Sequence, residues 1–210
     1  MLYLRGVGYH PAVTQTPILK EINLELAPQA LGLIIGPSGS GKTTLLEILA
    51  GLAEPTEGKI YWREQQLLPA HLQQLAGLVF QFPERHFCGG TLLEELRLGH
   101  PDIRQAQLEE ALAEVGLAHL SWQTSPQALS GGQQRRLALA VQLVRQPNIL
   151  LLDEPTAGLD WSMRRQLAKL LEKLKEHWTL LIVTHDPEEL RAIADHHWRI
   201  EGGLLRSLAP

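Results

Sequence analysis

The stretch from Gly36 to Thr44, GPSGSGKTT, has the residue types of a phosphate-binding loop. Its spacing is Gly36-x-x-x-x-Gly41-Lys42-Thr43. Glycines let successive backbone N–H groups turn inward around a polyphosphate, and the helix that follows presents its positive end. With this spacing Lys42 reaches the terminal phosphates, and the Thr43 hydroxyl can ligate Mg²⁺. The sequence therefore predicts a nucleotide site formed by Gly36, Pro37, Ser38, Gly39, Ser40, Gly41, Lys42, Thr43 and Thr44.

The acidic pair Asp153 and Glu154 is the second candidate for chemistry. It follows the apolar run 149–152, and a phosphate-binding loop is usually completed by a carboxylate at the end of a neighbouring strand. We expect Asp153 to bind Mg²⁺ directly or through water, and Glu154 to orient and deprotonate an attacking water. The alternative is that both acids cap a turn before Pro155, but the presence of the loop favours the metal and catalytic roles.

Buried strands and helices alternate around these motifs. The apolar run 31–35 predicts a strand, and 43–52 predicts a helix that closes near Gly51. This strand–loop–helix context favours a nucleotide site over a glycine-rich turn with a surface lysine. Further strands are expected at 18–26, 77–81, 149–152 and 179–183, an amphipathic helix at 163–177, and a hairpin at 198–207. The alternation implies an α/β fold with a mostly parallel sheet covered on both faces.

The segment 82–145 has a different character, because it shows helical periodicity and little that indicates strand. Its helices are expected at 91–98, 104–115 and 132–145. The sequence therefore predicts a helical lobe inserted into the α/β frame. On the last of these helices, Arg135 and Arg136 are expected to form a solvated face.

Composition and charge are those of an ordinary globular protein. Of the 210 residues, 44% are hydrophobic and 20% are charged, with a formal net charge of −4. No long basic run is present, so no nucleic-acid partner is expected. The single cysteine, Cys88, rules out an intramolecular disulfide and favours a reducing compartment. No secretory signal or membrane-length apolar run is seen, so we expect a cytoplasmic chain whose membrane role, if any, works through a partner protein.

The sequence Leu129-Ser130-Gly131-Gly132-Gln133 resembles the signature of ABC-type ATPases. The other elements of that family follow in order: Gln81 looks like the Q-loop glutamine, 157–160 like the D-loop and His185 like the switch histidine. Tyr9 stands where the family places an aromatic ring under adenine. Independently of the resemblance, Ser130 can cap a helix that starts with glycines, which creates a second anion-binding helix start.

The resemblance covers nearly the whole chain and implies its architecture. It implies a P-loop NTPase core with a mostly parallel sheet, an N-terminal antiparallel β subdomain and an inserted α-helical subdomain. We expect residues 1–210 to form a single ABC ATPase domain. Within it, 1–81 and 146–210 would form the α/β nucleotide-binding core, and 82–145 the helical insertion.

The resemblance also implies a dimer in which two subunits pair head to tail. Each ATP would then lie between the phosphate-binding loop of one subunit and the signature of the other. The residues expected to act in trans are Ser130, Gly131, Gly132, Gln133 and Asp160. The expected catalytic residues are Lys42, Gln81, Glu154 and His185, and the expected Mg²⁺ ligands are Thr43, Gln81 and Asp153.

Tyr9 and His185 each have a second interpretation. Tyr9 either stacks on adenine or packs on the core as a strand-end aromatic. His185 is either the switch residue or a core histidine, and its place before an expected helix start favours the switch role. That helix start is expected at Asp186-Pro187-Glu188-Glu189, which supplies an N-cap, a proline at the first position and a carboxylate at the third.

The stretch 80–96 is similar to the Q-loop region of energy-coupling-factor, cobalt-transporter-like ATPases, which power uptake of vitamins or transition-metal ions. Residues 87–90 and Gln29-Ala30 depart from the usual pattern of that subfamily. The resemblance implies a subunit at the cytoplasmic face of a membrane, with a second ABC ATPase subunit, identical or related, and a transmembrane transporter subunit as partners. The alternative is a soluble ABC ATPase of a cytosolic assembly machine, such as iron–sulphur cluster biogenesis.

Overall fold

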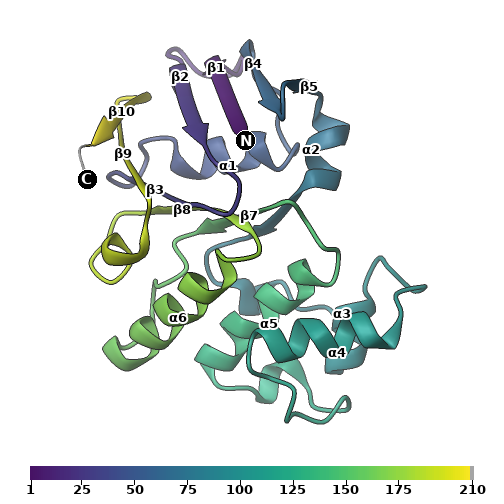
Figure 1. Ribbon diagram of the computed structural model, residues 1–210. Helices are drawn as coiled ribbons and strands as arrows, with labels where there is room; N and C mark the ends of the chain where they lie inside the picture. The colour runs from purple at the N-terminus through teal and green to yellow at the C-terminus, as the bar shows by residue number, and fades with distance from the viewer. Residues whose placement is uncertain (209–210) are drawn as a thin grey trace.

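The computed structural model describes residues 1–208, which form two β-sheets with helices packed between and below them (Figure 1). Sheet A is antiparallel with strand order β2-β1-β4-β5. Its strands are β1 (Leu2–Tyr9), β2 (Leu19–Leu26), β4 (Glu57–Trp62) and β5 (Gln65–Leu67). It lies at the top of Figure 1, above α1 (Lys42–Leu49) and α2 (Pro69–Leu75).

Sheet B has the strand order β10-β9-β3-β8-β7-β6. Its strands are β3 (Leu31–Ile35), β6 (Ala76–Val79), β7 (Ile149–Asp153), β8 (Thr179–Thr184), β9 (His196–Glu201) and β10 (Leu204–Leu208). All neighbours in it are parallel except the terminal β9–β10 hairpin. The carboxyl ends of β3, β8, β7 and β6 therefore meet at one edge of the sheet, which is where ligands bind in folds of this kind.

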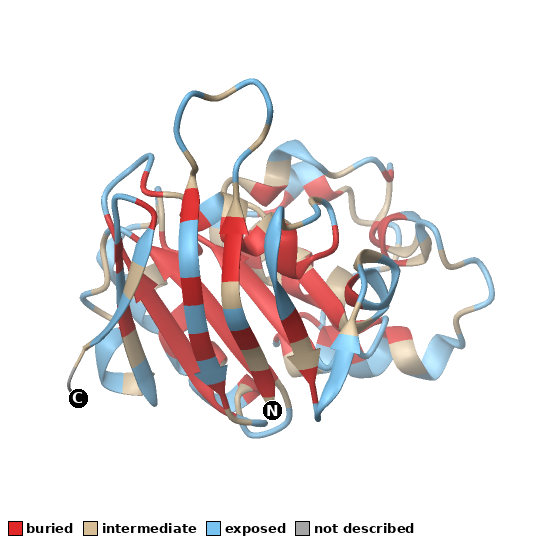
Figure 2. Cartoon of the chain, turned by 90° about the horizontal axis from the view of Figure 1, so that it is seen from above, coloured by how far each residue is buried: buried red, intermediate tan, exposed pale blue. Residues whose placement is uncertain are grey.

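Two apolar cores lie on the two faces of sheet B. One fills the space between sheet B, α1 and sheet A, and the other lies between sheet B and the helices below it. In β3, Ile34 belongs to the first core and Leu33 to the second, which explains why this strand is buried along its whole length. The strands of sheet A instead alternate buried and exposed positions, because one face meets solvent (Figure 2).

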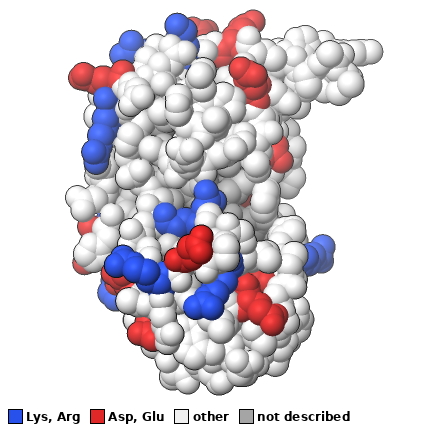
Figure 3. Space-filling view, turned by 90° about the vertical axis from the view of Figure 1, so that its right-hand side faces the viewer, with Lys and Arg blue, Asp and Glu red and all other residues white. Residues whose placement is uncertain are grey.

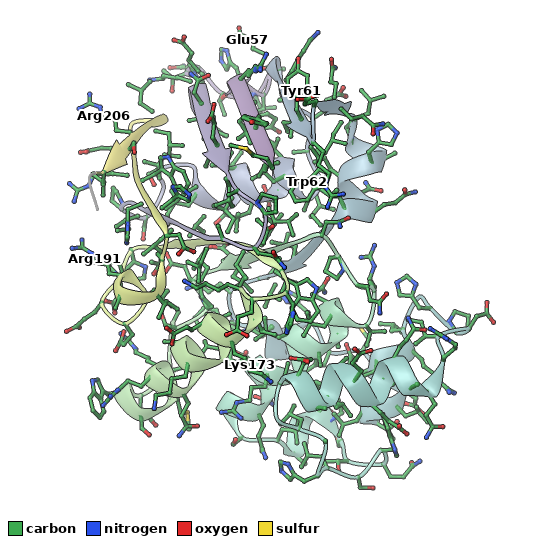
Figure 4. All side chains as sticks on the ribbon, viewed as in Figure 1. Glu57, Tyr61, Trp62, Lys173, Arg191 and Arg206 are labelled. Carbon is green, nitrogen blue, oxygen red and sulfur yellow. The ribbon has the colours of Figure 1, made fainter. Side chains whose placement is uncertain are left out.

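Along β4 the side chains follow this alternation. Trp62 is 8% exposed and packs in the core between sheet A and α1, whereas Tyr61 lies under the Arg5 guanidinium, 5.2 Å from its ring centre (Figure 4). Trp62 and Tyr61 thus lie on opposite faces of sheet A, as adjacent residues of a strand do.

The helices below sheet B are α3 (Leu92–Arg97), α4 (Gln105–Glu114), α5 (Gly131–Leu143) and α6 (Trp161–Leu174) (Figure 1). Lys173 of α6 lies 3.6 Å from Glu114 of α4. On the face shown in Figure 3, acidic and basic side chains are intermixed over the helical half of the molecule. Within residues 1–208, no helix has the length and apolar character needed to cross a bilayer.

Two expectations about local structure are wrong. Residues 186–187 are irregular, 188–190 form a turn and a short 3₁₀ segment, Arg191–Ile193, follows, so no helix starts at Asp186. The Asp186 carboxylate is paired with Arg164 of α6, so it is not free to cap the backbone. The strand expected at 77–81 ends at Val79, the last residue that pairs with β7, and Gln81 lies in the loop that follows.

Candidate active site

The phosphate-binding loop leaves β3 at Gly36 and enters α1 at Lys42. A Cβ atom on Gly36 would lie 2.4 Å from the Ile200 carbonyl oxygen, so only glycine fits there. Gly41, the N-cap of α1, has φ +98°, a conformation that L side chains rarely adopt. A hollow of about 450 Å³ lies against this loop. It is lined by Thr14, Thr16, Pro17, Ile18, Lys20, Pro37, Ser38, Gly39, Ser40, Gly202 and Gly203.

Two polar side chains of the loop suit a bound anion. The Lys42 side chain is 6% exposed, and its ammonium donates to the carbonyls of Gly36, at 2.8 Å, and Pro37, at 3.0 Å. The Ser40 hydroxyl is buried and has no hydrogen-bond partner within residues 1–208. A buried polar atom without a partner is costly, and a phosphate oxygen would satisfy it. The loop therefore has the shape and the donors of a polyphosphate cradle.

Thr43 and Asp153 bring two oxygen ligands together across the sheet edge. The Thr43 hydroxyl donates to Asp153 Oδ2 at 2.7 Å. Burial raises the pKa of Asp153; the Thr43 hydrogen bond opposes this shift, Glu154 adds to it, and Lys42 also opposes it. A divalent cation would stabilise the ionised form of this buried carboxylate, and paired hydroxyl and carboxylate oxygens are ligands that Mg²⁺ accepts. The residues present therefore fit a magnesium site.

Glu154 is the most extensively bonded acid of the site. It follows β7 with φ +47°, which is uncommon for a residue other than glycine, and it is 6% exposed. Thr184 donates its hydroxyl to Oε2 at 2.7 Å, and the His185 backbone N–H donates to Oε1 at 3.0 Å. His185 Nδ1 lies 2.8 Å from Oε1, and Lys42 Nζ lies 3.6 Å from it. The acid is thus held in one orientation at a strained backbone position, as functional residues often are.

The structure gives Gln81 and Tyr9 no direct bond to this cluster. Gln81 lies in the loop after β6, and within residues 1–208 no hydrogen bond joins it to Thr43 or Asp153. Tyr9 is half-buried at the end of β1, where its carbonyl accepts from the Ile18 N–H. Ile18 borders the hollow of the phosphate-binding loop, so Tyr9 lies beside that hollow without being part of its wall. The roles expected of these two residues stay predictions.

The signature starts α5 as the sequence predicts. Ser130 is the N-cap and accepts from Gln133 N at 3.4 Å, while Gln133 Oε1 accepts from Ser130 N at 3.0 Å, which completes a capping box. Asp160 caps α6 and accepts from Met163 N at 2.9 Å. A hollow of about 320 Å³ joins the two helix starts. Its lining residues are Ser130, Gly132, Gln133, Arg135, Arg136, Leu159, Asp160, Ser162, Met163, Gln166 and Leu167.

Sequence reasoning missed two residues. Thr184 is fully buried and orients Glu154; its position directly before His185 at the end of a strand was the available signal. Arg135 was expected on a solvated helix face but is 5% exposed, so that expectation is wrong. Its guanidinium turns inward because the Ala157 carbonyl and the Phe82 ring receive it there.

The fold and the loop define a nucleotide-binding α/β protein of the P-loop class. The profile of the ABC transporter family matches residues 19–157, and the chain belongs to that family. It is the ATP-binding component of such a transporter and an ATPase.

Known relatives agree with this assignment. The chain is 47% identical to ABC transporter I family member 11, chloroplastic, of Arabidopsis thaliana, over 99% of this chain and 81% of that protein. It is 39% identical to the energy-coupling factor transporter ATP-binding protein EcfA2 of Latilactobacillus sakei, over 91% of this chain and 72% of that protein.

Solved structures with the same fold include two informative neighbours. The cbiO1 protein of Clostridium perfringens, described as part of the ABC transporter complex cbiONQ, has a TM-score of 0.89 and 28% identity, with 98% of this chain and 86% of that chain covered. The ATP-binding cassette MJ0796, in a dimeric post-hydrolysis state with ADP and Pi, has a TM-score of 0.82 and 29% identity, with both chains covered completely.

Proposed function

We propose that the chain hydrolyses ATP to drive uptake of a small nutrient, a vitamin or a transition-metal ion, through a separate membrane protein. The main support for ATP hydrolysis is the position of the Glu154 carboxylate. It is bound by the Thr184 hydroxyl and the His185 backbone N–H, and it lies beside Lys42. The names of the EcfA2 and cbiO1 relatives support the role in transport, because both belong to transporters.

In this proposal each side chain of the cluster has one task. Glu154 takes a proton from the attacking water, and the hydrogen bonds from Thr184 and His185 hold its carboxylate in the required orientation. Lys42 and the loop N–H groups stabilise the negative charge of the phosphates, since they lie preorganised around the place where that charge develops. His185 senses or holds the terminal phosphate, and Tyr9 stacks on adenine.

Magnesium would be held by Thr43 and Asp153, with Gln81 as a further ligand, and would supply positive charge that offsets the negative charge of the phosphates. A Mg²⁺ titration of nucleotide binding, read by fluorescence of a labelled ATP, tests this role independently of turnover. Asp153→Asn should require a higher Mg²⁺ concentration for the same binding.

A second ATPase subunit completes each site in the proposal. Ser130 to Gln133 and Asp160 would contact the nucleotide held by the other subunit, because a capped, glycine-rich helix start binds phosphate well. The hollow between α5 and α6 is the surface that would receive it. The dimeric state described for MJ0796 supports this arrangement.

The membrane partner would dock beside Gln81. A mainly apolar hollow of about 290 Å³ lies there, between the end of β6 and α5. It is lined by Leu78, Val79, Phe80, Pro83, His86, Phe87, Glu95, Ala138, Val141 and Gln142. Docking would place the chain on the cytoplasmic face of a membrane, and Gln81 would report nucleotide state to the partner.

Two experiments test the proposal. Glu154→Gln in the full chain should abolish ATP turnover while labelled ATP still binds, and undiminished turnover would remove Glu154 as the base. The same variant, purified with ATP from gently solubilised native membranes, should retain a membrane-spanning partner. Recovery of only soluble proteins, with the chain absent from the membrane fraction, would favour the cytosolic assembly role instead.

A further inference from the structure

Arg135 lies where three functional segments of the chain meet. It is on α5, two residues after the signature, and only 5% of it is exposed. Its neighbour Arg136 is partly exposed and donates to the Gln166 side chain. An arginine this deeply buried is uncommon unless its guanidinium has specific partners.

The first partner of Arg135 is the turn that follows Glu154. Arg135 Nη2 donates to the Ala157 carbonyl at 2.7 Å. The Ala157 N–H in turn donates to the Glu154 carbonyl at 3.0 Å. The Arg135 side chain on α5 thus binds the backbone turn that begins at Glu154, the proposed base.

The second partner is Phe82, the residue after Gln81. Arg135 Cζ lies 5.7 Å from the centre of the Phe82 ring, and Arg85 Cζ lies 4.8 Å from it. A Cβ atom on Gly158 would be 3.6 Å from Phe82 Cε1, so the ring also lies against the turn 157–160. Phe82 has φ +57°, which shows that the surrounding contacts hold this loop in an unusual conformation.

Within the part of the chain that the structure describes, the charge of Arg135 is not paired with a carboxylate. Burial lowers the pKa of Arg135 and the charge of Glu84 raises it, but no salt bridge to Arg135 occurs within residues 1–208. Its Nη1 is buried and without a hydrogen-bond partner in the same residues. The planar guanidinium is therefore held by one carbonyl and one ring at the same time. A lysine ammonium can donate to a carbonyl, but it has no flat face to stack on the ring.

We propose that Arg135 is a positioning residue that couples the Gln81 loop to the Glu154 turn. A movement of Gln81 shifts the Phe82 ring, the ring shifts the guanidinium, and the guanidinium moves Ala157 and the backbone of Glu154. The inference rests on the proposed function, because it takes Glu154 as the base and Gln81 as the residue that reports nucleotide state to the membrane partner.

The test is a double-mutant cycle in the full chain between Arg135→Lys and Phe82→Leu. Lysine keeps the charge but loses the planar group that faces the Phe82 ring, so turnover should fall about tenfold, with the KM for ATP and the affinity for labelled ATP within about twofold. Phe82→Leu should give a similar loss. The double variant should be no slower than the slower single variant, because both remove the same coupling.

The matched control is Arg145→Lys. Arg145 follows the same helix and also donates to a backbone carbonyl, that of Gln73 at 2.9 Å, but it is exposed and belongs to no site. The turnover of the Arg145→Lys variant should equal that of the unaltered chain. Wild-type turnover in Arg135→Lys, or multiplied losses in the double variant, would overturn the proposal. The proposal would also be overturned if the loss of turnover in Arg135→Lys and Phe82→Leu were explained by a lowered melting temperature of these variants.

Phe82→Leu also stands alone as a test, since normal turnover in that variant contradicts the coupling even if Arg135→Lys fails to fold. Measuring Glu154→Gln in parallel distinguishes a failure of the proposed ATPase mechanism from a failure of the proposed coupling. If Glu154→Gln is inactive while Arg135→Lys is normal, the proposed ATPase mechanism stands and only the coupling fails.

Discussion

The two halves of the candidate site are built in opposite ways. We call residues 36–44 with Asp153, Glu154 and His185 the loop half, and Ser130–Gln133 with Asp160 the signature half. In the loop half, polar and charged side chains bond to one another across strand ends, as Thr43 does with Asp153 and Glu154 does with His185. In the signature half, the Ser130 and Asp160 side chains accept hydrogen bonds from their own helix starts, and from nothing else within residues 1–208.

Burial separates the halves in the same way. Lys42, Asp153 and Glu154 are each 5–6% exposed, whereas Ser130 and Asp160 are exposed at the edge of a hollow. Within residues 1–208, no hydrogen bond or ion pair links the signature half directly to the loop half. The difference teaches that the loop half is preorganised for chemistry by the chain itself, while the signature half is shaped to meet a surface supplied from outside.

Removing the base of the loop half should have the largest effect. Glu154→Gln is expected to lower turnover by about a thousandfold or more, because a positioned general base and its hydrogen-bond network are lost together. Thr184 and His185 N–H can still donate to the amide oxygen, so the fold should persist. Steady-state ATP hydrolysis measures the loss, and turnover within about tenfold of the unaltered chain would contradict the base assignment.

Asp153→Asn should lower turnover by about a hundredfold, because one Mg²⁺ ligand loses its charge. The same change should raise the melting temperature without nucleotide. Burial raises the pKa of Asp153, so its ionised form costs stability above its usual titration range, and asparagine removes that cost. Thermal unfolding at neutral pH measures the second effect, and a lowered melting temperature would count against it.

A negative charge in the signature half should lower turnover by about tenfold to a hundredfold without changing the isolated chain. Ser130→Asp keeps a good N-cap but repels phosphate, while Ser130→Asn caps equally well and is neutral. The comparison of the two variants isolates charge from capping. Equal turnover in both would mean that no phosphate approaches this helix start.

The smallest effect is expected outside both halves, at Asp195. Its carboxylate accepts from Leu31 N at 2.8 Å and from Lys175. Burial opposes ionisation, but these hydrogen bonds outweigh it and leave the pKa of Asp195 below its usual value. Its stabilisation is therefore present at neutral pH and lost as the pH falls through that lowered pKa, below about pH 4. Asp195→Asn should therefore make the free energy of unfolding slightly less dependent on pH in this acidic range, while leaving turnover unchanged.

The sequence predicts the loop half well because its parts are local. The strand 31–35, the loop and the helix after it are contiguous, and the strand at 149–153 ends where the acids begin. Ser130 as an N-cap follows from the same local rule. The closing hairpin, β9 and β10, likewise follows from two glycines between apolar runs.

The failures all depend on contacts between distant residues. Asp186 does not cap a helix because Arg164, 22 residues away, binds its carboxylate. Arg135 is buried because Ala157 and Phe82 approach it from two other segments. Thr184 orients Glu154 only because β7 and β8 are neighbours in the sheet. Spacing along the chain contains no information about such pairings.

The most direct test of the central claim is complementation between two inactive chains. Lys42→Ala disables the loop half and Ser130→Asp the signature half, so each variant alone should hydrolyse little ATP. Mixed in equal amounts, they should recover about a quarter of normal turnover, since half of randomly paired dimers are mixed and each has one intact site. A mixture no more active than its components would contradict the claim that one chain's signature completes the other chain's ATP site.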